Sequence, residues 1–531
     1  MPADYYSPGV YIEEVDKGAK PIQGVSTSVA AFVGFAEKAP DDRPHLVTNW
    51  TQFTSLFGGF LPDSYLAYAV RGFFDNGGRQ AYVVAVADSG GTGKETTRAA
   101  IASAAAIPAR LPSLGTSLHI EAVASGSAGE GIQVEVGPPG GEGATEDQFK
   151  MTVRQSGKEE VFDQLTFGRG RGARNVETIV NRESTLIRVR VLVAETDTAI
   201  DRLPQVGTHS LQPAQPQAAS LPAKVDPVQI QGNAEGRQGI LGLEAIEEIT
   251  ILCAPDLVSP RVLGGGREAL TRLKTVQLAM LNHCESMKDR FAILDSPPEL
   301  GVQEIKEWRS SIAGFDSMYG GMYYPWIKVA NQTPKAQRRD GEGDLISVPP
   351  CGHVAGVYAR VDSERGVHKA PANEVVRGAV DLGIQVTRNE QELLNPVGIN
   401  CIRAFPNMGI RIWGARTLSS DPGWRYINVR RLFNYVEESI EQSTQWVVFE
   451  PNDEDLWARV ARDISAFLER VWRSGALFGA TADEAFYVKC DRETNPPETR
   501  DVGQLICEIG IAPVKPAEFV IFRFSQKALQ A

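Results

Sequence analysis

The sequence predicts a mixed α/β and α+β protein of several domains. Three observations predict this class. A chain of 531 residues with 42% hydrophobic side chains has room for about three or four domains. Between residues 248 and 298, two buried-strand patterns flank one long helical pattern, which is typical of a parallel sheet. Residues 88–235 alternate apolar and polar side chains between glycine-rich turns, which indicates a separate β module.

The first twenty residues contain a short extended segment from Val10 to Val15, bounded by Pro8-Gly9 and by Gly18. A strand of this length is not stable alone. The opening residues lack the basic region and apolar stretch of a signal peptide, and no later run approaches the ~20 apolar residues of a membrane span. We therefore expect a soluble protein that is made in the cytoplasm and does not insert into a membrane.

The next segments predict two units. Residues 28–36 and 81–88 read as buried strands of one compact domain, with aromatic and glycine-rich turns between them. In the β module, the runs at 132–136 and 186–195 have the period of two that strands require. Residues 204–227 are rich in proline and glutamine and predict a linker, which places a domain boundary near residue 235.

The middle of the chain predicts a parallel sheet. Residues 248–256 and 290–298 read as strands, and a helix is expected from about 267 to 288, with Cys284 in its apolar stripe and hence in the core. Residues 323–330 are expected to continue this sheet. Residues 348–362 open another segment, in which Cys351 and His353 lie on one side of an expected strand.

The last section, from about residue 395, carries the clearest signals. Asp453 to Ser474 predicts a helix with acidic residues in its first turn, Arg470 and Arg473 near its end and Gly475 after it. An apolar stripe along it predicts packing against a core. A strand is expected at 504–511, and a very apolar one at 518–525.

Charge and motif content exclude several functions. The formal net charge of −12 argues against nucleic-acid binding, which needs a basic surface. The six cysteines form no C-x-x-C pair, and the six histidines show no ligand spacing. We expect no metal and no cofactor.

An enzyme is the main alternative. Asp256 and Asp295 follow the two predicted parallel strands, where α/β sheets bind ligands, and a pair of carboxylates can perform acid and base chemistry. The alternative function is therefore an α/β hydrolase that uses these two residues. Each aspartate is also followed closely by proline, which favours a turn and a purely structural role.

The two chain ends also allow two interpretations. A short strand at the N-terminus and an apolar strand at the C-terminus can fold back onto their own domain. Alternatively, they reach outward and add to the sheets of neighbouring subunits, which is β-augmentation. Each added backbone hydrogen bond contributes ~0.5–1.5 kcal/mol.

Long runs at both ends resemble one family, the tail sheath proteins of contractile phages and phage-like contractile injection systems. The runs are YYSPGVYIEEVDKGAKPIQGVSTSVAAFVGFAEKAP (5–40), NCIRAFPNMGIRIWGARTLSSDPGWRYINVRRLFNYVEESI (400–440), VVFEPNDEDLW (447–457) and PAEFVIFRFSQ (516–526). The resemblance implies a structural subunit and no enzyme. Such subunits stack as six-membered rings in a helical tube around an inner tube, and the tube shortens to drive the inner tube through a target envelope. A non-contractile shell protein is a further alternative.

The resemblance also implies an organisation and a set of partners. It predicts an N-terminal arm (1–20), a composite core (21–87 and 395–512), a β-rich variable insertion (88–235), a middle α/β domain that is subtilisin-like in fold only (236–394), and a C-terminal arm (513–531). The expected partners are other sheath subunits, the inner tube protein, the baseplate and the tail terminator or cap, and no nucleic acid. Assembly is expected in the bacterial cytoplasm, as part of a phage tail or a phage-like particle. The arms are expected to connect neighbouring subunits through Pro8, Gly9, Val10, Tyr11, Ile12, Val15, Phe519, Val520, Ile521, Phe522 and Phe524.

Overall fold

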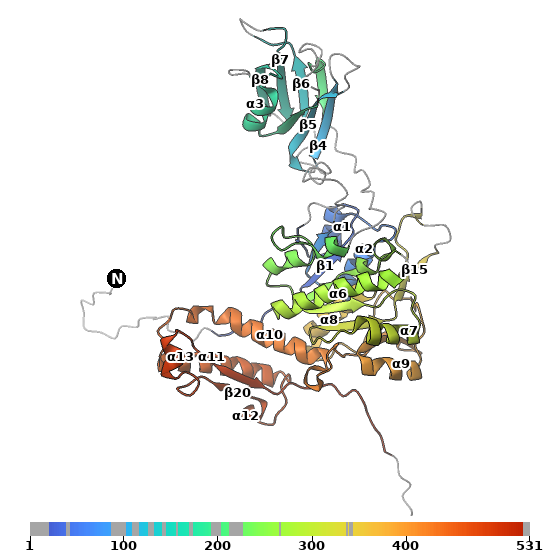
Figure 1. Ribbon diagram of the computed structural model, residues 1–531, viewed down its shortest axis with the longest axis vertical. Helices are drawn as coiled ribbons and strands as arrows, with labels where there is room; N and C mark the ends of the chain where they lie inside the picture. The colour runs from blue at the N-terminus through green and yellow to red at the C-terminus, as the bar shows by residue number, and fades with distance from the viewer. Residues whose placement is uncertain are drawn as a thin grey trace, which may run out of the picture.

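The fold is described from a computed structural model of the whole chain. It is a mixed α/β fold with several sheets: a large sheet, a helical region that carries a small sheet, and a β-rich insertion (Figure 1). The structure describes residues 21–38, 43–86, 102–108, 116–125, 132–140, 145–155, 158–168, 174–192, 203–211, 227–264, 267–335, 338 and 343–523.

The large sheet has nine strands, and its six inner strands, from β18 to β3, run parallel. The remaining strands at its two edges pair antiparallel. The parallel strands are apolar along their length, as expected for strands that are covered on both faces. The order across the sheet is β16 (Glu374–Val375), β19 (Gly409–Trp413), β18 (Ile399–Phe405), β13 (Gly320–Tyr324), β12 (Phe291–Asp295), β11 (Ile251–Cys253), β1 (Ala30–Gly34), β3 (Ala81–Ala85) and β2 (His45–Val47).

Helices cover both faces of this sheet. Because neighbouring side chains of a strand point to opposite faces, Phe32 packs into the core on the side of α2 (Leu66–Asn76) and α8 (Cys351–Arg365). Val33 packs on the other side, against the predicted helix, which is α6 (Arg267–Met287). Cys284 is buried in that second core, as predicted. The short helices are α1 (Trp50–Phe57), α4 (Pro227–Gln231), α5 (Pro260–Leu263), α7 (Val302–Glu307) and α9 (Arg388–Leu394).

The prediction of a strand at Cys351 and His353 is wrong, because both residues lie in helix α8. Every residue from Cys351 to Val361 is buried, so the segment has no polar face that would reveal a helical period. Gly352 faces α2 closely, since a Cβ atom on it would lie 2.2 Å from the carbonyl oxygen of Ala69. The small residues of α8 thus allow the two helix backbones to meet.

The observed sheet differs from the predicted grouping of segments. The sequence placed 21–87 with 395–512, and apart from 236–394. In the structure β1 pairs with β11, and β13 pairs with β18, so all three segments contribute strands to one sheet. Two strands that pair in parallel can be far apart in the sequence. The apolar pattern of a strand therefore does not indicate which strands lie next to it in the sheet.

Two predicted strands are shorter than expected. Residues 323–330 do not form one strand, because β13 ends at Tyr324 and β14 (Ile327–Ala330) belongs to a separate three-stranded sheet. In that sheet β14 pairs with β15 (Leu345–Val348) and β17 (Asp381–Leu382). The strand expected at 504–511 is shorter, since β21 spans only Glu508–Ile511.

The predicted β module is present as an insertion, drawn apart from the large sheet in Figure 1. Its own core is built from both of its sheets and from α3 (Val176–Glu183). Part of the predicted linker belongs to it, because β10 pairs with β6. The four-stranded sheet contains β10 (Gly207–Ser210), β6 (Gln133–Gly137), β7 (Phe149–Gln155) and β8 (Lys158–Leu165); the three-stranded sheet contains β4 (Ala102–Pro108), β5 (Thr116–Ser125) and β9 (Ile187–Val191).

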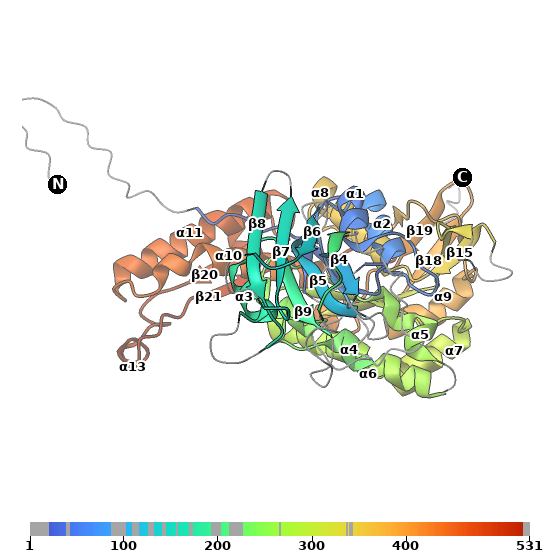
Figure 2. The ribbon, with the colours of Figure 1, turned by 90° about the horizontal axis from the view of Figure 1, so that it is seen from above.

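The helical region packs around the last predicted helix, α11 (Glu454–Arg473). Asp453, expected as its first residue, lies just before it and caps its first turn through the side chain. Its apolar stripe packs on α10 (Ile427–Ser443) and on the two-stranded sheet of β20 (Phe486–Lys489) and β21. Two short helices, α12 (Ala482–Ala485) and α13 (Pro497–Asp501), complete the region. Figures 1 and 2 both draw it at one end of the molecule, away from α7 and α9.

No helix within the described residues is long and apolar enough to cross a bilayer.

Candidate functional site

The C-terminal segment first follows the helical region and then leaves it. The amide of Ala512 donates to the carbonyl of Ala485 at 2.9 Å, and that of Val514 donates to the carbonyl of Ala476 at 3.1 Å. The side-chain amide of Asn428, near the start of α10, donates to the carbonyl of Val514 at 3.1 Å. These bonds fix the path of the segment as far as residue 514.

Glu518 anchors the segment a few residues further on. Its carboxylate accepts two hydrogen bonds from the Arg416 guanidinium, at 2.9 and 2.7 Å, one from the Asn395 amide at 2.7 Å, and one from the Tyr426 hydroxyl at 3.1 Å. Burial acts to raise the pKa of Glu518, but the hydrogen bonds from Arg416 and Asn395 outweigh it and lower that pKa. Glu518 is therefore a charged, half-buried anchor.

Beyond this anchor the chain is apolar and uncovered. Four consecutive side chains are 68–77% exposed: Phe519, Val520, Ile521 and Phe522. Residues 518–523 form no strand with any described part of the chain. A run of this kind exposes apolar surface together with free backbone donors and acceptors, which is the requirement for adding a strand to another sheet edge. Phe524 lies outside the described residues.

The β20–β21 sheet has two open edges. Within the described residues each strand pairs only with the other. Phe486, Val488, Ile509 and Ile511 pack one face of the sheet against the core around α11. A lone two-stranded sheet is marginal in stability, and a third strand strengthens it.

Residues 22–27 lie along α10 from its C-terminal end. The amides of Gln23 and Val25 each donate to a serine hydroxyl of α10, Ser443 and Ser439, at 3.2 Å. The Arg470 guanidinium of α11 donates to the carbonyl of Ile22 at 2.6 Å. We call residues 22–27 the strap. The predicted N-terminal arm residues, Pro8, Gly9, Val10, Tyr11, Ile12 and Val15, lie outside the described residues.

A buried ion pair lies where the strap ends. The Arg431 guanidinium binds both carboxylate oxygens of Asp362, at 3.0 and 2.5 Å, and both side chains are less than 5% exposed. Arg431 also donates to the Thr27 carbonyl at 2.8 Å, and the Thr27 hydroxyl donates to Asp362 at 2.7 Å. Burial acts to lower the pKa of Arg431, but the Asp362 charge outweighs it and raises that pKa. The pair ties α8, α10 and the strap together.

The structure gives both candidate catalytic aspartates structural partners. Asp256 is fully buried and accepts backbone hydrogen bonds from Phe35, at 2.6 Å, and Tyr65, at 2.5 Å. Asp295 accepts the amide of Cys351, at the start of α8, at 2.9 Å. Burial raises the pKa of each to about 7, against these hydrogen bonds. Within the described residues the two carboxylates share no hydrogen-bond partner, and each holds a separate chain turn, which is the structural alternative weighed from the sequence.

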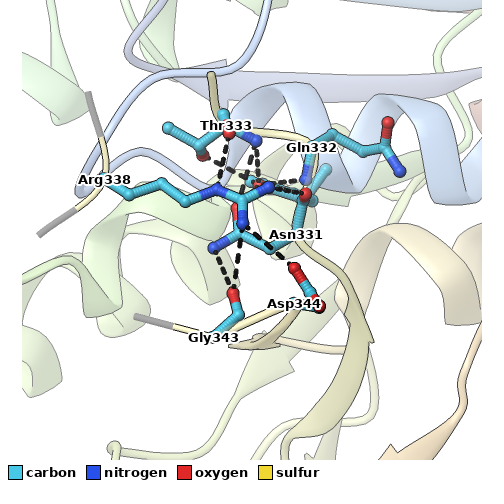
Figure 3. Close-up of polar contacts among 7 residues, drawn as sticks. Asn331, Gln332, Thr333, Arg338, Gly343 and Asp344 are labelled. Atoms are coloured by element: carbon cyan, nitrogen blue, oxygen red, sulfur yellow. Dashed lines mark hydrogen bonds and ion pairs between the residues drawn. The ribbon is translucent and has the colours of Figure 1, made fainter. Parts of the chain in front are cut away.

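A third polar group closes the loop after β14 (Figure 3). The Arg338 guanidinium donates to the carbonyls of Asn331, at 2.6 Å, and Thr333, at 2.8 Å. The Tyr68 hydroxyl of α2 accepts the amides of Gln332 and Thr333, both at 3.1 Å. These donors and acceptors satisfy one another, so the group holds the loop against α2. Within the described residues, no three His, Cys, Asp or Glu side chains are placed to hold a metal ion.

These observations define the class of protein as a mixed α/β chain with an anchored, uncovered apolar C-terminal segment. Comparison with known families is more specific. The model of the phage tail sheath protein central domain matches residues 233–418, and that of the phage tail sheath C-terminal domain matches residues 419–527. The chain belongs to the phage tail sheath family.

Curated relatives and solved structures agree with this assignment. The chain is 24% identical over 311 residues to the tail sheath protein of Vibrio phage KVP40, covering 55% of this chain and 45% of that one. It is also 24% identical over 274 residues to that of Escherichia phage P2, covering 50% and 63%. The chain thus spans less than two thirds of either relative.

Two contracted assemblies share the fold. The PVC sheath complex of an extracellular contractile injection system has a TM-score of 0.56 at 24% identity, and the comparison covers 99% of each chain. The helical sheath of the anti-feeding prophage also has a TM-score of 0.56, at 23% identity, covering 99% of this chain and 100% of that one. The homologues are thus components of phage tails or phage-like particles.

Sequence reasoning missed the anchor and the strap. Glu518 and Arg416 are 102 positions apart, and Gln23 and Ser443 are 420 apart. No local pattern links such partners. The apolar run after Glu518 was the one signal that the sequence contained.

Proposed function

We propose that the protein is the structural subunit of a contractile sheath. Subunits stack as six-membered rings in a helix around an inner tube, and the sheath shortens to drive that tube through a target envelope. The observation that carries this proposal is that the models of two tail sheath domains match consecutive segments of the sequence, which together span residues 233–527. The role is structural, with no catalytic step and no cofactor. Assembly takes place in the bacterial cytoplasm.

The two chain ends are the connectors between subunits in this proposal. Residues 519–522 have the apolar side chains and unpaired backbone of an added strand, and the β20–β21 sheet offers open edges. Four added hydrogen bonds at ~0.5–1.5 kcal/mol each and the burial of large side chains oppose an ordering cost of ~1–2 kcal/mol per residue. One arm therefore binds weakly, and a lattice of arms binds strongly. The N-terminal arm, from Pro8 to Val15, acts in the same way.

The sheet and the family matches support a revised division into domains. We place the end of the middle domain near residue 418, after β19, instead of 394. Residues 21–87 then belong with the middle domain, since β1 and β3 lie in its sheet. Residues 419–512 form the helical region with the strap. The other partners are the inner tube protein, the baseplate and the terminal cap.

Electron microscopy of the particle tests this function. The full chain, expressed with its own tube and baseplate proteins, should form striated tubes in a long and a short state. Deletion of residues 1–18 should leave a folded protein that forms no tubes, and Ile521→Asp should act alike because the exposed side chain contributes little to the fold. Val161→Asp, in β8 of the insertion, is a matched control at a half-exposed valine and should still assemble. Normal contractile tubes from the deletion would refute the connector role.

A further inference from the structure

Two cysteines face each other where the β20–β21 hairpin meets its loop. Lys489 and Glu508 are the last pair of the antiparallel ladder, and the same register continued by one residue places Cys490 opposite Cys507. Both are free thiols; Cys490 is buried and Cys507 is half-buried. The 16 residues between them include α13.

The register gives this position the spacing of a disulfide. The hydrogen bond from the Ala512 amide to the Ala485 carbonyl marks 485 and 512 as a hydrogen-bonded pair. Such pairs alternate along an antiparallel ladder, so 490 and 507 form a non-hydrogen-bonded pair, in which the Cα atoms lie about 4.5 Å apart. Disulfides span Cα distances of roughly 4.4–6.8 Å.

The register points the two side chains to the same face of the hairpin. Cys507 lies on the face of β21 that packs towards α11, together with Ile509 and Ile511. Burial, together with the neighbouring Cys490 thiol, raises the pKa of Cys507 to about 12. Asn495 fixes the loop beside them, because its side-chain amide donates to the Ile506 carbonyl at 2.9 Å and its carbonyl accepts the Ile506 amide at 2.6 Å.

We propose that Cys490 and Cys507 are a disulfide site, oxidised when the protein meets a low-molecular-weight disulfide such as oxidised glutathione. The more exposed Cys507 loses its proton and attacks one sulfur of the reagent, which expels one glutathione thiolate and leaves a mixed disulfide. Cys490 then loses its proton and attacks the Cys507 sulfur, which expels the second glutathione thiolate. The protein is oxidised by two electrons, and the reagent is reduced to two thiols.

A second pair provides an internal comparison. The Cys253 thiol donates to the Cys351 carbonyl at 3.8 Å, and both residues are fully buried between β11 and α8. A dissolved reagent does not reach this pair while the chain is folded. Oxidation should therefore select Cys490 and Cys507. The resulting bond closes the loop of residues 491–506. It should lower the equilibrium constant for opening of the hairpin about 100-fold, as loop-closure entropy predicts for a loop of this length.

The test uses the full chain, purified with reductant, desalted and incubated with oxidised glutathione at neutral pH. Digestion without reduction, followed by mass spectrometry, should find the Cys490 and Cys507 peptides joined. Cys490→Ser and Cys507→Ser should each abolish the joined peptide, and the matched control Cys284→Ser should retain it. Hydrogen exchange at the Ala512 amide should slow after oxidation of the unmodified chain.

The result for the unmodified chain tests the proposal by itself, so the test does not depend on whether a serine variant folds. A joined peptide from Cys490 and Cys507 supports the proposal. Absence of that peptide, glutathione left on Cys507 alone, or bonds between different chains would each overturn it.

Discussion

The anchor of the C-terminal segment allows a quantitative test through Glu518→Gln. The carboxylate accepts four hydrogen bonds, of which two come from the Arg416 guanidinium, and the two side chains are 19% and 14% exposed. Breaking a buried pair by changing one partner costs about 3–5 kcal/mol. Because water still reaches this pair, we expect a loss of about 2–3 kcal/mol. The segment should then detach roughly 30–150 times more often.

Hydrogen exchange of the intact protein measures this detachment. The Val514 amide is protected by its bond to the Ala476 carbonyl, and it should exchange faster in Glu518→Gln by that factor. Glu498→Gln is the matched control, because Glu498 is exposed in α13 and lies 20 positions before Glu518. Unchanged exchange at Val514 in Glu518→Gln, or equal acceleration in the control, would refute the anchoring role.

The same anchor predicts a dependence on pH. The folded pKa of Glu518 is lowered, so its contribution to stability is complete above the ordinary glutamate pKa of about 4.3 and is lost as the pH falls through the folded value. The difference in melting temperature between the natural protein and Glu518→Gln should therefore shrink below about pH 4. A difference that stays constant down to pH 2 would contradict this sign.

Three further substitutions test the buried contacts. Arg431→Met leaves the Asp362 carboxylate buried and unpaired, so thermal unfolding should show a loss of about 3–5 kcal/mol; an unchanged melting temperature would contradict the tie between α8, α10 and the strap. Asp256→Ala removes the acceptor of two backbone amides, and urea unfolding should show a loss of about 2–4 kcal/mol, whereas a catalytic role alone predicts little change. Gly352→Ala forces a Cβ atom against the Ala69 backbone and should cost about 1–3 kcal/mol in thermal unfolding, unlike Gly343→Ala, which meets open space.

The elements that the sequence predicted well are those with a one-sided pattern. Helix α11 has an apolar stripe, acidic residues in its first turn and arginines in its last turn, and these signals agree. Helix α6 was found from its stripe as well. Helix α8 was missed because its residues from Cys351 to Val361 are all buried. They therefore show neither the 3.6-residue period of a one-sided helix nor the two-residue period of a one-sided strand. Its glycines, which we now see against α2, gave no local signal of a helix.

The candidate site was predictable only where it is continuous in sequence. The exposed segment from Phe519 to Phe522 is recognisable in the sequence as a run of apolar residues near the C-terminus. Its anchor is not, since Arg416 contacts Glu518 only after β19 and the C-terminal segment have folded side by side. The carboxylates of Asp256 and Asp295 show the opposite error: their position after parallel strands suggested chemistry, and the fold uses them as hydrogen-bond acceptors.

The strap and the C-terminal segment meet α10 near its opposite ends, at Ser443 and at Asn428. The helix has 17 residues and is therefore about 25 Å long. A pull applied to both ends of the chain loads α10 along its axis, in the direction of its own hydrogen bonds. The large sheet takes up part of the pull at the C-terminal end, because Glu518 is bound to Arg416, just after β19. Because α10 has a fixed length, it sets the distance between the two points at which the chain ends pull on the subunit.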